Sequence, residues 1–179
     1  MSTFRQNSLD ASTQSVQPHS LTAKVIHWGV TGVFIYALTK QLDEVEELED
    51  FSLLQQEMAF AAAFLILLLA RFFYMHSTRH TAVVDAMPEL MKRLARYCHF
   101  GMYVSLSMIA ASGLMIGGLY WSGIKSGVAM DVVLGLHEIS VIASYYLIGL
   151  HVAGAIYHRR KRDGIWNAMV PVWKEPTGD

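Results

Sequence analysis

The sequence predicts an all-α membrane protein, a four-transmembrane-helix up-and-down bundle with both termini in the cytoplasm. Three observations predict it: four long apolar segments, the overall composition, and the placement of charge between the segments. Of the 179 residues, 53% are hydrophobic and 16% are charged, and the mean hydropathy is +0.32. Such a chain is too apolar for an ordinary soluble domain, and no nucleic-acid partner is expected.

Four segments approach the length of about 20 apolar residues that a membrane-spanning helix needs. They cover residues of about 23–41, 53–75, 94–119 and 132–157. The second contains the run MAFAAAFLILLLARFFYM, whereas the first and fourth carry ionisable residues that cost free energy in lipid unless they face the bundle interior. These functional candidates are Lys24, His27, His137, Glu138 and His151.

Charge orients the four segments. The first loop, QLDEVEELEDF, carries six acidic residues, while basic residues follow the second and fourth segments. By this count twelve of the fourteen Lys and Arg residues lie on one side, and only Lys40 and Lys125 lie on the other. Because basic loops stay in the cytoplasm, we expect both termini there and a multi-pass protein of the bacterial inner membrane.

The remaining segments are expected to be tails and loops. Residues 1–20 are polar, lack the apolar core of a signal peptide, and predict a cytoplasmic tail. Residues 21–160 form the transmembrane domain, and residues 161–179 a cytoplasmic C-terminal tail. The stretch 76–93 contains Pro88 and is interpreted as a loop with a short interfacial helix.

Histidine must supply any metal chemistry, because Cys98 is the only cysteine. His27 lies about one helical turn inside the cytoplasmic boundary of the first segment, and His151 lies about 10–12 Å inside the same boundary of the fourth. Each could be a lone polar group hydrogen-bonded to a neighbouring helix. Their matched depth favours the axial ligation of a haem b iron instead.

His137 precedes His151 by fourteen residues, which is about 21 Å along a helix and nearly four full turns. The two histidines therefore face the same side at opposite leaflets, a spacing that suits two stacked haems. His99 is expected either to contact a haem propionate or a quinone, or to be structural. Arg71 is expected either to extend to lipid headgroups or to bind a propionate, and the propionate is favoured. No iron is assigned to the other histidines, which are His19, His76, His80 and His158.

Together these residues resemble the bacterial cytochrome b561 family, whose relatives include cytochrome b subunits of formate dehydrogenases and nickel–iron hydrogenases. The resemblance extends from residue 20 onward. It is carried by IHW at 26–28, LLLAR at 67–71, CHFGMY at 98–103, and LHEIS, IGLH and AIYHRRKRDGIWNAMVP through 171. It implies a four-helix bundle with two b-type haems, the cytoplasmic one held by His27 and His151.

The resemblance also implies an outer haem, held by His137 and by a histidine fourteen residues before Arg71. That position is Glu57, so the fourth ligand is missing. Three interpretations remain: no outer haem, a haem held by His137 and Met58, or a five-coordinate haem. Met58 is one residue from the family's position and would be turned by about 100° on a helix, so one haem is favoured.

The expected function is electron transfer between quinone or quinol and a redox partner, in the membrane or the periplasm, within a respiratory chain. Alternatives are a cytochrome b anchor subunit of a larger oxidoreductase and a superoxide:quinone oxidoreductase. The superoxide activity is weakened because the acidic segment 43–50 would repel an anion. A non-redox alternative is a haem sensor or a structural membrane protein.

Overall fold

The computed structural model describes residues 20–39, 48–78 and 88–175, and its regular elements there are helical. They are α2 (Leu21–Leu38), α3 (Phe51–Ser77), α4 (Glu89–Trp121), α5 (Val128–Lys161) and the short α6 (Ile165–Met169). The first four are long and apolar enough to cross a membrane, which confirms the predicted all-α fold with four membrane-spanning helices, and the cytoplasmic placement of the termini stays a prediction. The expectations for the N-terminal tail with His19, for acidic residues 43–47 and for His80 lie outside the described residues.

Helices α3, α4 and α5 are longer than the apolar segments because polar residues begin and end them, whereas α2 ends at Leu38, three residues earlier than expected. Asp50 caps α3 by accepting hydrogen bonds from the backbone N–H groups of Ser52 and Leu53. Helix α4 begins five residues earlier than expected, directly after Pro88, whose φ of −56° suits a helix start. Residues 89–93, expected in the loop, therefore belong to α4. Within them Lys92 Nζ lies 3.0 Å from Glu89 Oε1, about one turn away.

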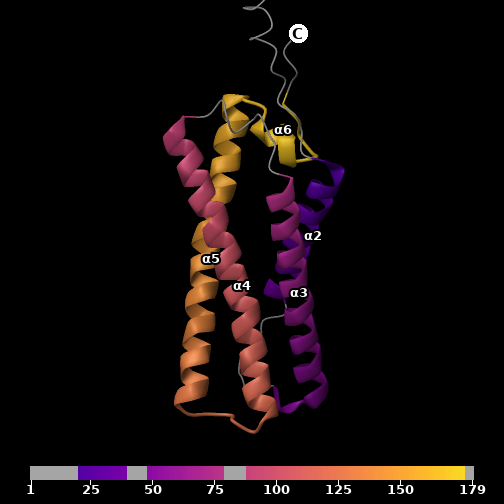
Figure 1. Ribbon diagram of the computed structural model, residues 1–179, viewed down its shortest axis with the longest axis vertical. Coiled ribbons are helices and arrows are strands. Elements are labelled where there is room, and N and C mark those ends of the chain that lie inside the picture. Colours follow the sequence, from indigo (N-terminus) through magenta and orange to yellow (C-terminus); the bar gives the residue numbers. More distant parts are fainter. Residues whose placement is uncertain (1–19, 40–47, 79–87, 176–179) are drawn as a thin grey trace, which may run out of the picture.

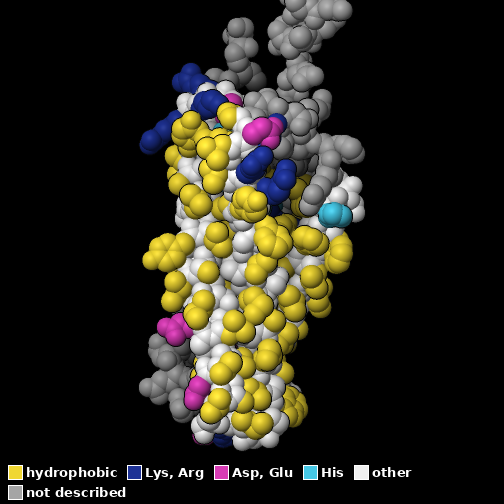
Figure 2. Space-filling view, turned by 60° about the vertical axis from the view of Figure 1, so that its left-hand side comes forward, with side chains coloured by type: hydrophobic (Ala, Val, Ile, Leu, Met, Phe, Trp, Pro, Cys, Tyr) yellow, Lys and Arg dark blue, Asp and Glu magenta, His cyan; other side chains and the backbone are white. Residues whose placement is uncertain are grey.

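The helices run up and down, with α2 packed on α3, α3 on α4 and α4 on α5 (Figure 1). The basic end of the bundle is the end where α2 begins and α5 runs into Arg159, Arg160, Lys161 and Arg162. Hydrophobic side chains cover much of the surface between this end and the opposite end (Figure 2). Such a surface is suited to lipid rather than water.

Small residues bring α4 and α5 close together. Ser105 and Ser112 of α4 and Ser140 and Ser144 of α5 are buried. Gly101 lies so near α5 that a Cβ atom there would be 3.1 Å from Leu147 Cδ1. Small residues allow this close approach between membrane helices. Among the described residues, α2 and α5 form no comparably packed pair, so the bundle is looser between them.

Helix α6 links the two loosely packed helices at the basic end (Figure 1). Lys24 Nζ of α2 donates to the carbonyl oxygen of Asn167 at 3.4 Å, and Trp28 Nε1 donates to that of Met169 at 3.2 Å. The described part of the expected C-terminal tail therefore folds back across the bundle.

Two apolar clusters fill the rest of the interior. The middle cluster joins α2, α3 and α4 through Val30, Phe64, Leu68, Leu106 and Ala110. The opposite-end cluster joins the starts of α3 and α5 to the end of α4. Its buried members are Leu48, Leu54, Ile116, Tyr120, Met130 and Val133. Neither cluster includes His27 or His151, which lie near the basic end, whereas His137 lies toward the opposite end beside Ser112.

Candidate functional site

His27 of α2 and His151 of α5 come together near the basic end, where their helices are not closely packed. Their ring centroids are 6.3 Å apart and the ring planes meet at 62°. Both side chains are half-buried. Two imidazoles from different helices therefore converge in the interior, as their positions along the sequence predict.

His99 of α4 is a third imidazole beside this pair. Its ring centroid is 4.9 Å from that of His151, with the planes at 80°. His99 Nδ1 donates to the carbonyl oxygen of Ala95, one turn earlier, at 2.6 Å. This bond fixes the ring orientation and leaves Nε2 for other contacts. His99 is exposed at the bundle surface, whereas His27 and His151 are partly enclosed.

Arg71 of α3 points toward these histidines. Its Nη1 lies 2.5 Å from His27 Nδ1, and its Nε donates to the hydroxyl oxygen of Tyr103 at 3.1 Å. A guanidinium has only donors, so His27 Nδ1 accepts in this arrangement. Arg71 is thus held between α2 and α4 and places a positive charge inside the bundle.

The spacing of the rings decides which pair fits a haem iron. A metal–imidazole bond is about 2 Å long, so two nitrogens on one metal lie about 4 Å apart and the ring centres about 6 Å apart. The 6.3 Å between His27 and His151 fits this geometry. The 4.9 Å between His99 and His151 is too short for iron to lie between them. His99 therefore lies beside the pair, on the side of His151.

Arg71 fits the same cofactor in a different way. A metal-ligating imidazole donates its other N–H to a neighbouring group, so a ligating His27 would no longer accept from Arg71. The guanidinium would then be released, with Tyr103 still orienting its Nε. Its fork matches a carboxylate, which is the chemistry of a haem propionate.

His137 of α5 lies toward the opposite end and is held by Ser112. Its Nδ1 is 2.9 Å from Ser112 Oγ, and that hydroxyl lies 2.5 Å from the carbonyl oxygen of Met108. Since the hydroxyl proton is directed to the carbonyl, Ser112 accepts the proton on His137 Nδ1. The bond satisfies a half-buried imidazole and orients it as ligating histidines are oriented.

Met58 is packed against α4 beside the opposite-end cluster. A Cβ atom added at Gly117 would lie 2.6 Å from Met58 Cγ and 3.0 Å from Met58 Sδ. Met58 also contacts the opposite-end cluster, so its side chain fills part of that core. Glu57, at the position of the family's ligand, is half-buried on α3. The surroundings of Met58 are those of a packing residue.

Tyr103 and Ser112 position Arg71 and His137, and the sequence analysis assigned neither role. Tyr103 lies four residues after His99 and therefore on the same face of α4, which is a signal that helical spacing contains. Ser112 and His137 are 25 residues apart and lie on different helices, so no spacing within one helix indicates their contact.

Over the described ranges, no three His, Cys, Asp or Glu side chains gather as a bare metal ion would require. An iron carried by a porphyrin needs only two axial protein ligands. A family model described as prokaryotic cytochrome b561 matches residues 18–172. No curated protein and no solved structure matched the chain.

Proposed function

The chain belongs to the prokaryotic cytochrome b561 family, and from this we propose that it carries electrons through one haem b held by His27 and His151. The observation that carries the proposal is the 6.3 Å separation of these two rings across the loosely packed side of the bundle. Haem b binding and membrane electron transfer are what the family implies. The proposal adds the number of haems and their ligands.

Each residue of the site has a distinct role in this proposal. His27 and His151 would hold the iron, Arg71 would bind a propionate, and Tyr103 would orient Arg71. When bound, the haem supplies a one-electron carrier whose iron has no open position for oxygen between two imidazoles. The site is therefore suited to electron transfer rather than to oxygen activation at the metal.

His99 is the residue we assign to a quinone or quinol substrate. Quinone reduction consumes protons as well as electrons, and an imidazole exchanges protons near neutral pH. His99 Nε2 is not engaged by Ala95, and the side chain is exposed on the bundle surface, where a lipid-soluble molecule has access. It lies beside His151, so proton and electron transfer would occur at adjacent places.

We place this site on the cytoplasmic side of a bacterial inner membrane. Twelve of the fourteen Lys and Arg residues belong to the basic end or to the segments that adjoin it. The redox partner is either in the membrane or in the periplasm. The acidic first loop that would dock a basic periplasmic protein lies mostly outside the described residues, and its Glu49 pairs with Lys125 at 3.0 Å.

A reduced-minus-oxidised spectrum and a pyridine haemochrome assay on the purified protein test the proposal. We expect one haem b per chain, lost in His27→Gln and in His151→Gln. His76→Gln is the matched control, because His76 is an exposed histidine that stacks on Phe72 near the same end. Retention of the haem in both variants would refute this ligand pair, and two haems per chain would refute the single site.

Quinol oxidation distinguishes a self-sufficient carrier from an anchor subunit. If the protein works alone, reduced quinone added to the purified protein should reduce the haem. A cytochrome b anchor would instead co-purify with a soluble redox subunit, and its haem would be reduced only when that subunit is present. A protein without any Soret absorption would be a structural membrane protein.

A further inference from the structure

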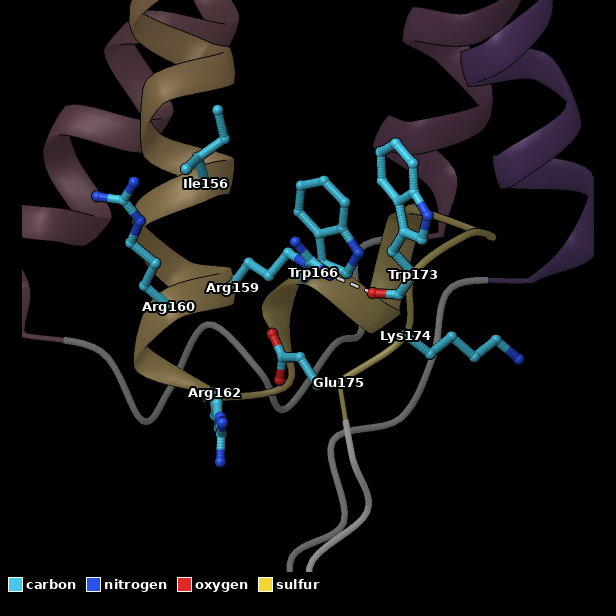
Figure 3. A pocket seen from close by; sticks show the side chains of 8 residues that line it. All are labelled: Ile156, Arg159, Arg160, Arg162, Trp166, Trp173, Lys174 and Glu175. Carbon is cyan, nitrogen blue, oxygen red and sulfur yellow. Dashed lines mark hydrogen bonds between the residues drawn. The ribbon is translucent and has the colours of Figure 1, made fainter.

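A hollow of about 780 Å³ lies at the basic end, between the end of α5 and the folded segment 163–175 (Figure 3). We propose that it binds the headgroup of an anionic phospholipid, a phosphodiester that also carries a hydroxyl group, as in phosphatidylglycerol. Four basic side chains surround the hollow, and two indole rings form an apolar wall. They are Arg159, Arg160, Arg162, Lys174, Trp166 and Trp173.

Arg159 is the fixed cation of this site. Its guanidinium lies 5.2 Å from the ring centroid of Trp166 and 6.0 Å from that of Trp173. Its Nε donates to the carbonyl oxygen of Trp173 at 3.3 Å, which leaves its other N–H groups for a ligand. In Figure 3 Arg159 points toward the two indoles, whereas Arg160, Arg162 and Lys174 extend outward around the rim.

The charge around the hollow is unbalanced. Its four basic side chains face one carboxylate, that of Glu175, and none of the four forms an ion pair with another described residue. The nearby Asp163 is engaged by His158, at 2.7 Å, and by Lys161. A net negative ligand would compensate this excess, and a zwitterionic headgroup would do so less well.

Glu175 supplies the second, independent indication of a ligand. The side chain is 8% exposed, and its Oε2 accepts from the backbone N–H of Gly164 at 2.9 Å. Its Oε1 is buried and has no hydrogen-bond partner among the described residues. A buried carboxylate oxygen without a donor is costly, and a headgroup hydroxyl would provide that donor. Phosphate and hydroxyl together therefore match the basic groups and Glu175.

The position of the hollow indicates a lipid rather than a free anion. It lies where the apolar part of α5 ends, and Ile156 and the two indoles form its wall. Tryptophan and arginine are typical of the membrane–water interface, and basic pockets at the cytoplasmic surface bind anionic headgroups. The site lies apart from the haem ligands His27 and His151, so the haem spectrum can report correct folding in every variant.

Native mass spectrometry of the haem-loaded protein tests the proposal. The protein is supplied with equal amounts of phosphatidylglycerol, phosphatidylethanolamine and phosphatidic acid, and the retained lipids are counted. We expect phosphatidylglycerol to exceed phosphatidylethanolamine. Arg159→Gln should reduce its retention about tenfold, as expected for the loss of one charge-assisted hydrogen bond. Arg160→Gln, on the rim, should give a smaller reduction in phosphatidylglycerol retention. It replaces Arg159→Gln in the experiment if that variant does not fold.

Two further variants sharpen the test. Glu175→Gln keeps an acceptor for Gly164 but replaces the free acceptor with a donor, so retention of phosphatidylglycerol should fall relative to phosphatidic acid. Arg96→Gln is the control, because Arg96 is exposed on α4 and does not line the hollow. Equal losses in Arg96→Gln and Arg159→Gln would overturn the site. Displacement of the lipid by millimolar inorganic phosphate would indicate a free-phosphate site and overturn the lipid assignment.

Discussion

Replacing Gly117 by alanine tests whether Met58 is a packing residue or an iron ligand. The added Cβ would lie 2.6 Å from Met58 Cγ and 3.0 Å from Met58 Sδ, whereas favourable carbon contacts are about 3.5–4.0 Å. Met58 contacts the opposite-end cluster, which restricts its movement away from α4. Such overpacking costs about 1–3 kcal/mol, against a gain of at most about 1 kcal/mol from helix propensity.

We therefore expect Gly117→Ala to lower the unfolding free energy by about 1–2 kcal/mol. Thermal unfolding in detergent, followed by circular dichroism, should show a Tm decrease of about 2–8 °C. Gly118→Ala is the matched control, because a Cβ atom at the next residue meets nothing within 4 Å. Its Tm should be unchanged or slightly raised.

Combining Gly117→Ala with Met58→Ala completes the test. Met58→Ala alone removes a partly buried side chain and should be destabilising, but it also removes the atoms that the new methyl group would strike. The double variant should be more stable than the sum of the single effects by about 1–3 kcal/mol. The haem spectrum should be the same in all variants. Equal stability of Gly117→Ala and Gly118→Ala would refute the packing argument, and a spectral change in Met58→Ala would identify Met58 as a ligand.

Three other substitutions test the remaining parts of the structure. His99→Ala should keep one haem per chain and slow haem reduction by quinol about a hundredfold, and loss of the haem would contradict its place beside the proposed iron ligands. Ser112→Ala should lower the unfolding free energy by about 1–3 kcal/mol, because His137 Nδ1 loses its hydrogen bond to the Ser112 hydroxyl, and Ser112→Thr in the same melting assay is the control. The Ser52 hydroxyl and the backbone N–H groups of Ser52 and Leu53 lower the pKa of Asp50 below its usual 3.8. Asp50 therefore stabilises the protein above that pH and loses this effect as the pH falls further. When Tm is plotted against pH, its decrease at acid pH should be smaller in Asp50→Ala than in the unchanged protein. An equal decrease in both proteins would contradict the assignment.

The four membrane-spanning helices could be predicted because each satisfies a local requirement for length and apolarity. The ends of these helices could be predicted less well, because they depend on caps such as Asp50 and on the start of α4 after Pro88. The depth of His27 and His151 followed from the charges that flank their helices. Their lateral approach depends on how α2 and α5 are placed by α3, α4 and α6, which no local pattern encodes.

The direction in which the Arg71 side chain points could not be predicted from local sequence either. The sequence leaves a choice between lipid headgroups and the interior, and only the position of Tyr103 on the neighbouring helix resolves it. The fold of the C-terminal segment was still harder to predict, because it depends on contacts that no local sequence pattern indicates. Trp166 Nε1 donates to the carbonyl oxygen of Val172, and Asn167 Oδ1 accepts from the backbone N–H of Glu175. These bonds turn an expected tail into a cap over the basic end.

The two ends of the bundle differ in packing, and this difference agrees with our proposal of one haem rather than two. At the opposite end, Met58 and the surrounding apolar cluster occupy the interior, and His137 is satisfied by Ser112. Near the basic end, α2 and α5 pack loosely, and the ring centroids of His27 and His151 lie 6.3 Å apart. Because well-packed interiors resist inserted volume, a second porphyrin at the opposite end would have to displace that cluster.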